Sequence, residues 1–287
     1  MRGALMRNSD VEPYGTVHVG FQNVSGTTET GQVQFKNPVA IAVGKEATLF
    51  VVDQGTKTVH MFSAEGKAVS TFSIPTAWAR GVAVSPTSGN ILIVENENQS
   101  VMTFTPSGEL VHSFHSDHFS SCYGIAEAND GRILAVDYSE HCVAMFESDG
   151  TFIRSIGKRG DGEGEFYRPF FIAMTKSDGF VVSDSYNHRL QTFNKDGHFE
   201  RAFGQRGETN ADFELPLGVG VGGRGEIVVA DRDNHRLQVV DTNGSHVTTI
   251  ANDDGRLDSP ANIAVTYDGH VYVINGKDKS VDKFKYN

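Results

Sequence analysis

The stretch YRPFFIAMTKSDGFVVSDSYNHRLQTFNKDGHFERAFGQRG, residues 167–207, and its near copy LPLGVGVGGRGEIVVADRDNHRLQVVDTNG, residues 215–244, decide the fold. Each begins with an apolar strand, a turn at glycine and a second apolar strand that ends in an acid. A polar loop and a further strand follow, then a glycine turn that leads into a fourth strand. Six copies of this pattern follow one another. The residues that end their second strands are Asp53, Glu95, Asp137, Asp184, Asp231 and Asn275.

These strand-ending residues lie 42–47 positions apart, and a repeat of that length carrying four strands is typical of a β-propeller blade. The sequence therefore predicts an all-β fold: a six-bladed β-propeller of four-stranded antiparallel blades. We expect the blades over residues 35–72, 77–114, 121–157, 167–204, 213–250 and 257–286.

The last copy ends soon after its third strand, at Asn287, and so lacks a fourth strand. A matching strand stands at the other end of the chain, Thr16–Gly20, followed by a glycine-rich connector like those of the later copies. We expect residues 14–20 to complete the last blade, since ring closure removes open sheet edges. Residues 14–287 would then form one domain, and residues 1–13 a disordered tail.

Composition limits the classes of function. The 25 Lys and Arg against 36 Asp and Glu give a net charge of −11, which argues against a wholly basic nucleic-acid binder but not against a local binding face. No apolar run is long enough to span a membrane. Two cysteines in 287 residues favour a reducing, cytoplasmic location. Two strand steps, about 10 Å, should separate Cys122 from Cys142 and prevent a disulfide.

Two repeated sets of polar residues invite an enzymatic interpretation. We expect the strand-ending acids instead to cap the loops that follow them and to pair with Arg189 and Arg236. His141, His188 and His235 share one position in three blades, but sheets packed about 10 Å apart cannot easily share one zinc ion. The sequence contains no familiar catalytic motif. It therefore predicts no catalytic residue, no metal, no cofactor and no enzymatic activity.

The direction of the strands brings the start of each first strand to the same face as the loops between second and third strands. We call this the top face. Its opening positions, between the start of each first strand and the following small residue, are Val39, Arg80, Tyr123, Phe170, Leu217 and Ala261. Flanking and loop positions add Trp78, Tyr167, Arg168, Lys57, Tyr138, Tyr186, Arg232 and Lys277.

Aromatic rings interspersed with arginines suit single-stranded RNA, because unstacked bases pack on the rings and guanidinium groups contact phosphates or base edges. The predicted RNA-binding residues are Arg80, Tyr123, Tyr138, Arg168, Phe170, Tyr186 and Arg232. Other interpretations stay open. The same face suits a partner peptide, and the aromatic side chains could simply fill the channel mouth. A propeller hydrolase or lyase is a further interpretation, and it has the least support in the sequence.

The Asn-His-Arg-Leu stretches at residues 187–190 and 234–237 resemble the NHL repeat, as do the Pro-x-Gly-Ile-Ala-Val strand starts and the Phe-Gly connectors. The resemblance covers residues 14–287, although blades 1, 2 and 6 lack the Asn-His-Arg triplet. The ring most resembles the C-terminal NHL domain of TRIM-NHL and Brat-like post-transcriptional regulators.

That resemblance implies binding of single-stranded RNA, often uridine-rich, and repression of messenger RNAs in the cytoplasm. It further implies protein partners in RNA-silencing or repression complexes, and neither DNA nor membrane as a partner. The RING, B-box and coiled-coil parts of that family do not occur in this sequence. Any ubiquitin-ligase activity would belong to domains outside it.

Overall fold

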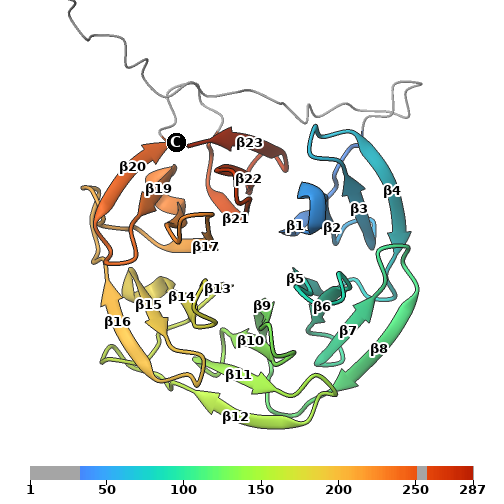
Figure 1. Ribbon diagram of the computed structural model, residues 1–287, viewed down its shortest axis with the longest axis horizontal. Coiled ribbons are helices and arrows are strands. Elements are labelled where there is room, and N and C mark those ends of the chain that lie inside the picture. Colours follow the sequence, from blue (N-terminus) through green and yellow to red (C-terminus); the bar gives the residue numbers. More distant parts are fainter. Residues whose placement is uncertain (1–32, 251–256, 287) are drawn as a thin grey trace, which may run out of the picture.

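A computed structural model of the protein describes residues 33–250 and 257–286. Its strands form six sheets arranged in a ring, with the first strand of each sheet at the centre (Figure 1). Consecutive strands within a sheet pair antiparallel. This confirms the predicted all-β fold, a six-bladed β-propeller of four-stranded antiparallel blades.

The blades follow one another along the chain. Blade 1 comprises β1 (Pro38–Val43), β2 (Leu49–Asp53), β3 (Thr58–Phe62) and β4 (Ala68–Ser73). Blade 2 comprises β5 (Ala79–Val84), β6 (Ile91–Glu95), β7 (Ser100–Phe104) and β8 (Leu110–His115). Blade 3 comprises β9 (Cys122–Glu127), β10 (Ile133–Asp137), β11 (Cys142–Phe146) and β12 (Phe152–Ile156).

Blade 4 comprises β13 (Ile172–Met174), β14 (Phe180–Asp184), β15 (Arg189–Phe193) and β16 (Phe199–Phe203). Blade 5 comprises β17 (Pro216–Val221), β18 (Ile227–Asp231), β19 (Arg236–Val240) and β20 (His246–Ile250). Blade 6 comprises β21 (Pro260–Val265), β22 (His270–Asn275) and β23 (Val281–Lys285). Short 3-10 turns are η1 (Lys45–Ala47), η2 (Ser185–Asn187) and η3 (Arg232–Asn234).

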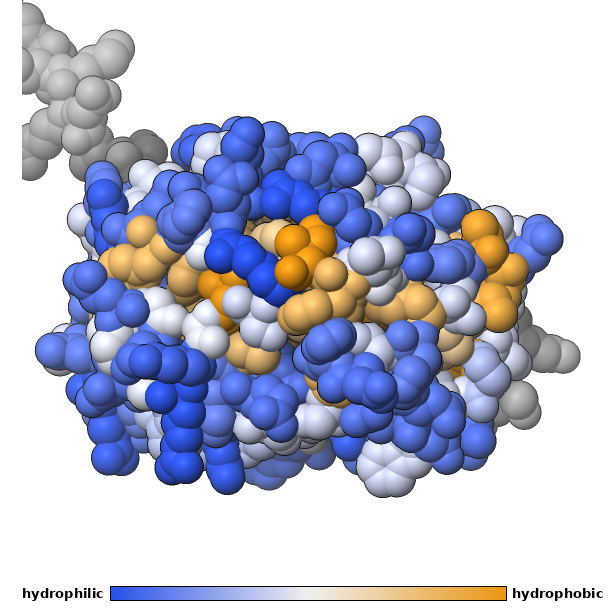
Figure 2. Space-filling model, turned by 90° about the horizontal axis from the view of Figure 1, so that it is seen from below, coloured by the Kyte–Doolittle hydropathy of each residue, from blue (hydrophilic) through white to orange (hydrophobic). Residues whose placement is uncertain are grey.

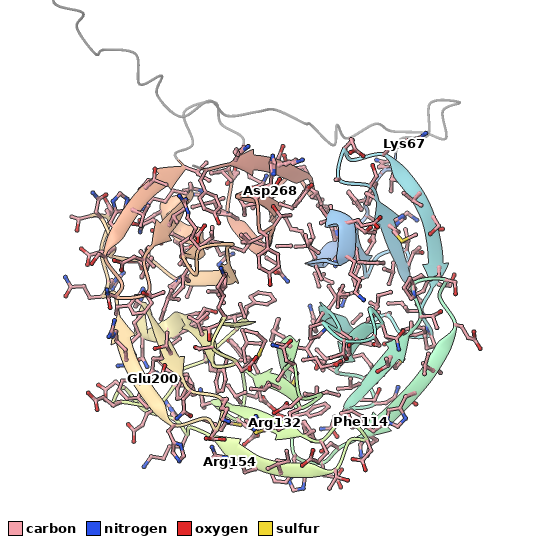
Figure 3. The ribbon with its side chains drawn as sticks, in the orientation of Figure 1. Lys67, Phe114, Arg132, Arg154, Glu200 and Asp268 are labelled. Atoms are coloured by element: carbon pink, nitrogen blue, oxygen red, sulfur yellow. The ribbon has the colours of Figure 1, made fainter. Side chains whose placement is uncertain are left out.

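The core lies between neighbouring blades, because the second and third strands bury side chains on both faces of each sheet. Phe114 of blade 2, labelled in Figure 3, packs on Phe146 of blade 3 with ring centroids 5.3 Å apart. The first and last blades join in the same way, since Phe35 and Ile41 share a buried cluster with Tyr272 of blade 6. Packing across this junction closes the ring of inner strands. The predicted closing strand, residues 14–20, and the predicted tail, residues 1–13, lie outside the described residues.

Most first strands open with a β-bulge, which re-aims one side chain toward the channel mouth. In blade 3, Asp137 pairs with Cys122 and Val136 pairs with Gly124, so Tyr123 is left out of the ladder. Arg80 is left out in the same way in blade 2. The side chains at the opening positions therefore do not follow the regular alternation between the two faces of the strand.

Blade 4 differs from the other blades, because its first strand covers only the three residues Ile172–Met174, whereas each of their first strands covers six. The Ser183 side chain accounts for this difference. Its hydroxyl accepts the Phe171 N–H at 2.9 Å, while the Phe170 N–H donates to the Ser183 carbonyl at 3.1 Å. The serine thus replaces part of the regular ladder just where Phe170 reaches the channel mouth.

Small residues beside the opening positions allow the inner strands to crowd together. A Cβ on Gly124 would lie 2.8 Å from the Phe170 carbonyl oxygen, and one on Gly81 would lie 2.2 Å from that of Tyr123. Both distances are far below a normal contact, so only glycine fits. The close approach brings Arg80, Tyr123 and Phe170 side by side.

On the rim around β12, Figure 2 shows a row of apolar side chains across the middle with hydrophilic residues above and below it. Leu110, Val111 and Ile153 are exposed on these outer strands. Among the described residues, no helix is long and apolar enough to cross a membrane. Cys122 and Cys142 form no disulfide, as predicted, and both are buried. Burial raises the pKa of Cys142 to about 11.

Candidate functional site

The loops between second and third strands lie beside the residues that lead into the first strands. The Tyr138 N–H donates to the Ser121 carbonyl at 3.0 Å, and the Tyr186 N–H donates to that of Tyr167 at 3.1 Å. In blade 2, the Asn96 N–H donates to the Trp78 carbonyl at 3.2 Å. The opening positions and the loops therefore form one surface, the top face, as strand direction predicted.

Four aromatic side chains of blades 3 and 4 form a contiguous cluster on this face. The ring centroid of Tyr123 lies 4.8 Å from Phe170 and 5.5 Å from Tyr138. Tyr138 lies 5.0 Å from Phe170 and 6.3 Å from Tyr186. All four side chains are half-buried, and their planes are tilted or perpendicular rather than stacked. Each ring is thus fixed by its neighbours.

Arg80 extends the cluster into blade 2. Its guanidinium carbon lies 5.4 Å from the Tyr123 ring centroid and 5.8 Å from that of Trp78. Trp78 is 49% exposed, which makes it the most accessible ring beside the channel mouth. The Arg80 Nε is buried without a hydrogen-bond acceptor among the described residues. A ligand oxygen at this point would satisfy that donor.

Arg168 lies at the opposite end, above three tyrosines. Its guanidinium carbon is 5.0 Å from the Tyr186 ring centroid, 5.1 Å from Tyr138 and 5.9 Å from Tyr167. The backbone of Arg168 is left-handed, with φ of 52°, and its N–H donates to His141 Nδ1 at 2.8 Å. The backbone of this arginine is therefore held by the preceding blade.

The two loop tyrosines have opposite electrostatic environments. Burial, then hydrogen bonding with Tyr186, raises the pKa of Tyr138. The pKa of Tyr186 is lowered by its hydrogen bond with Tyr138 and then by that with Arg168. Hydrogen bonding to Tyr186 in turn raises the pKa of the Arg168 guanidinium. The three side chains form one polar network on an aromatic base.

The structure brings six of the seven sequence-predicted residues into the cluster, and Arg232 lies at its edge, where its positive charge helps to lower the pKa of Tyr186. Arg232 begins η3 and lies 3.6 Å from Asp233 as an ion pair, and within the described ranges it has no cation–π partner. Sequence reasoning missed Arg159, whose guanidinium carbon lies 5.3 Å from the Tyr167 ring centroid. The same connector recurs before blade 5, where Arg206 occupies the equivalent position, so an alignment of the two connectors is the signal that could have found Arg159.

The repeated acids and histidines are structural. Asp184 accepts from the Tyr167 N–H at 2.7 Å and from the Arg189 Nε at 2.8 Å. The Nδ1 atoms of His188 and His235 accept the backbone N–H of Leu215 and Ser259, as His141 does for Arg168. Across the described ranges, no three His, Cys, Asp or Glu residues gather in a way that could hold a metal ion.

Comparisons with known proteins place the chain among propellers. Residues 213–240 match the NHL repeat, and residues 116–181 match a family described as a 6-bladed beta-propeller. The chain is 25% identical over 131 residues to Protein brain tumor from Drosophila melanogaster, a match that covers 43% of this chain. The chain thus spans only 13% of the length of that relative.

Solved structures of varied function share the architecture. One is a catalytically inactive virginiamycin B lyase from Staphylococcus aureus with quinupristin, at a TM-score of 0.65 and 12% identity, covering 96% of this chain and 100% of that one. Another is a nidogen/laminin complex, at a TM-score of 0.66 and 14% identity, covering 79% and 84%.

The likeness to the lyase corrects one prediction. The inference from motifs that this chain is not an enzyme is contradicted, because virginiamycin B lyase, a protein of the same fold, is an enzyme. The absence of a familiar catalytic motif is therefore not evidence against an activity of this fold. At these identities the likeness itself establishes only the shared fold.

Proposed function

We propose that this propeller binds single-stranded RNA across its top face, from Trp78 in blade 2 to Tyr186 in blade 4. The observation that carries the proposal is the unbroken series of aromatic rings with an arginine over each end. Single-stranded nucleic acids are recognised by such surfaces, because bases stack on rings and guanidinium groups contact phosphates.

In this proposal, the two ends of the series of aromatic rings contact the RNA in different ways. Trp78 is exposed enough to receive a base, while the unsatisfied Nε of Arg80 can donate to a phosphate or a base oxygen. Arg168 is oriented by its backbone bond to His141 and by the tyrosines below it. Because these groups are already fixed in place, ordering them on binding costs little entropy.

The acidic body does not oppose this function. The Debye length in physiological salt is about 8 Å, so carboxylates on the rim act weakly at the channel mouth. Stacking contributes about 1–3 kcal/mol per base, and several such contacts can exceed a weak long-range repulsion. The NHL match and the similarity to Protein brain tumor support uridine-rich RNA as the ligand and post-transcriptional repression as the role. A cytoplasmic location and partners in repression complexes remain part of this proposal.

A binding titration with a uridine-rich oligonucleotide tests the proposal. Tyr123→Ala should weaken binding by about 1–3 kcal/mol, as loss of one stacking platform does. Arg168→Ala should weaken binding and, if the contact is to phosphate, reduce the salt slope by about one. The matched controls are Tyr267→Ala and Arg224→Ala, exposed residues in the turns of the opposite face, and both should bind as the wild type does.

Unchanged affinity in the folded Tyr123 and Arg168 variants would move the RNA site elsewhere. If the wild type does not bind uridine, adenosine or cytidine oligomers at all, the top face is better explained as a docking site for a partner peptide. Aromatic and arginine side chains also dominate the binding energy of protein interfaces. The same variants would then map that interface.

A further inference from the structure

The opposite end of the channel contains an acid where the repeat otherwise places aliphatic side chains. We call this end the lower face; it carries the turns between first and second strands. The last residue of each first strand lines it, and these residues are Val43, Val84, Glu127, Met174, Val221 and Val265. Five blades thus contribute an apolar side chain and blade 3 contributes a carboxylate.

Glu127 is only partly satisfied at this position. Its Oε1 accepts from the Ser85 hydroxyl at 2.7 Å and more weakly from that of Thr87 at 3.5 Å. Among the described residues no lysine, arginine or histidine lies within ion-pair distance of it. Burial raises the pKa of Glu127 in spite of the two hydroxyls. A carboxylate among aliphatic side chains lacks the cation that would stabilise its charge.

Glu127 faces a cavity of about 570 Å³ that all six blades line. That volume lies within the usual range for sites of small organic ligands. Deeper in the channel the walls are buried aliphatic residues, among them Ile41, Val82 and Ile263. Lys176, the only cationic side chain of the lining, donates to the Gly223 carbonyl, and Asp178 accepts from the Asn129 amide. The cavity therefore has an aliphatic wall deep in the channel and a polar mouth, where Glu127 and Asp178 are the acids and Lys176 is the cation. Glu127 is the acid of this lining whose pKa burial raises.

We propose that this lower-face cavity binds a small organic cation, a primary ammonium on an aliphatic body, with the ammonium against Glu127. The ammonium supplies the charge partner that Glu127 lacks and three hydrogen-bond donors. The aliphatic body covers the branched side chains of the channel wall. A metal ion fits this cavity poorly, because no three His, Cys, Asp or Glu residues of the described chain gather there to coordinate it.

The alternative is that Glu127 serves only to tie blade 3 to blade 2 through Ser85. Two features of the ring argue against that role. The five other blades close with Val or Met at this position, so the ring does not need the tie. A serine–asparagine or serine–threonine pair would join the blades without placing a charge in an apolar cavity. Substitutions can separate the two roles.

Calorimetric titration of the purified full chain with three probes of equal length tests the proposal: hexylammonium, 1-hexanol and hexanoate. The wild type should bind hexylammonium at least about tenfold more tightly than 1-hexanol, and hexanoate least. Glu127→Gln keeps the shape and removes the charge, so it should abolish the preference for the ammonium. Ser85→Ala removes the hydroxyl donor and keeps the charge, so it should retain the preference.

The wild-type comparison is decisive by itself if Glu127→Gln does not fold. Equal binding of hexylammonium and 1-hexanol, or binding of neither, overturns the proposal, as does a folded Glu127→Gln that keeps the preference. The top-face variant Tyr123→Ala should bind hexylammonium as the wild type does. The proposal for the cavity and the proposal for the RNA site can therefore be contradicted independently of each other.

Discussion

Asp184 illustrates how a single buried carboxylate organises a blade. Its two oxygens accept from the Tyr167 N–H, the Arg189 guanidinium and the Asn187 amide. The Gln191 amide also donates to it, at 3.0 Å. The side chain is fully buried, and Asp231 repeats the same contacts in blade 5. The carboxylate joins the loop, the third strand and the connector of its own blade.

Removing this carboxylate should therefore damage the blade severely. Asp184→Ala leaves the 15% exposed Arg189 side chain without its counter-ion. It also removes a hydrogen-bond acceptor from two side-chain amides. Breaking a buried ion pair on one side costs about 3–5 kcal/mol. Urea denaturation should show a loss of that order, whereas a loss below about 1 kcal/mol would mean that the network is redundant. Glu200→Ala, at an exposed acid of the outer strand β16, is the acidic control and should change the stability little.

Sequence reasoning identified the residues of the top face but not their orientation. Arg80, Tyr123 and Phe170 were found because they break a repeated pattern at one position. The contacts between these side chains depend on the β-bulges and on the close packing of neighbouring inner strands at glycines. No local sequence pattern predicts either feature. Glu127 breaks the pattern in the same way, and comparing the six strand ends would have revealed it. The role of His141 could not be foreseen, because its partner is a backbone N–H 27 residues away.

At the scale of elements, adjacent blades are joined by a histidine bond that recurs three times. His141, His188 and His235 each have a left-handed backbone and accept, through Nδ1, the N–H of the residue before the next blade's proline. An accepting Nδ1 requires a neutral imidazole with its proton on Nε2. The histidine of the Asn-His-Arg triplet thus holds neighbouring blades in register.

This bond predicts a pH dependence of stability. Burial, followed by the positive charges of Arg159 and Arg168, lowers the pKa of His141 below its ordinary 6.5, although Asp137 and Glu140 act in the opposite direction. The unfolded chain therefore binds the proton first. The free energy of unfolding should fall as pH drops from about 6.5 to the lower folded pKa, and the loss is complete below it.

Urea denaturation midpoints measured across this pH range test whether the hydrogen bond of His141 contributes to stability. His141→Gln retains a hydrogen-bond acceptor and does not titrate, so its midpoints should fall less steeply with acid than those of the wild type. If the urea midpoints of the two proteins fall in parallel with decreasing pH, protonation of His141 does not contribute to the pH dependence of stability.

At the scale of the whole molecule, the repeat allowed the ring to be predicted from sequence almost completely. The shortened first strand of blade 4 was not predicted, because it depends on the Ser183 hydroxyl, which replaces ladder bonds there. The inner closure is formed by packing of blade 6 on blade 1. Blade 6 has three strands among the described residues, and residues 14–20 remain the predicted fourth.

Deleting residues 1–21 tests that prediction. Loss of a closing strand would leave the outer edge of β23 unpaired, and open edges favour aggregation. The truncated protein should melt at a lower temperature and aggregate at concentrations where the full chain stays monodisperse. Deleting only residues 1–12, which precede the predicted strand, should have no such effect. A truncated chain with an unchanged melting temperature would rule out closure by this strand.

The most direct test of the RNA-binding proposal uses the emission of Trp78, the single tryptophan of the chain, which lies beside Arg80 on the top face. Titration with a uridine-rich oligonucleotide should change this emission saturably, and Tyr123→Ala should shift the midpoint to higher concentration by about 1–3 kcal/mol of binding free energy. Tyr267→Ala should leave the titration unchanged. Oligonucleotide binding detected on a filter without any change in Trp78 emission, or no binding at all, would contradict RNA recognition by this face.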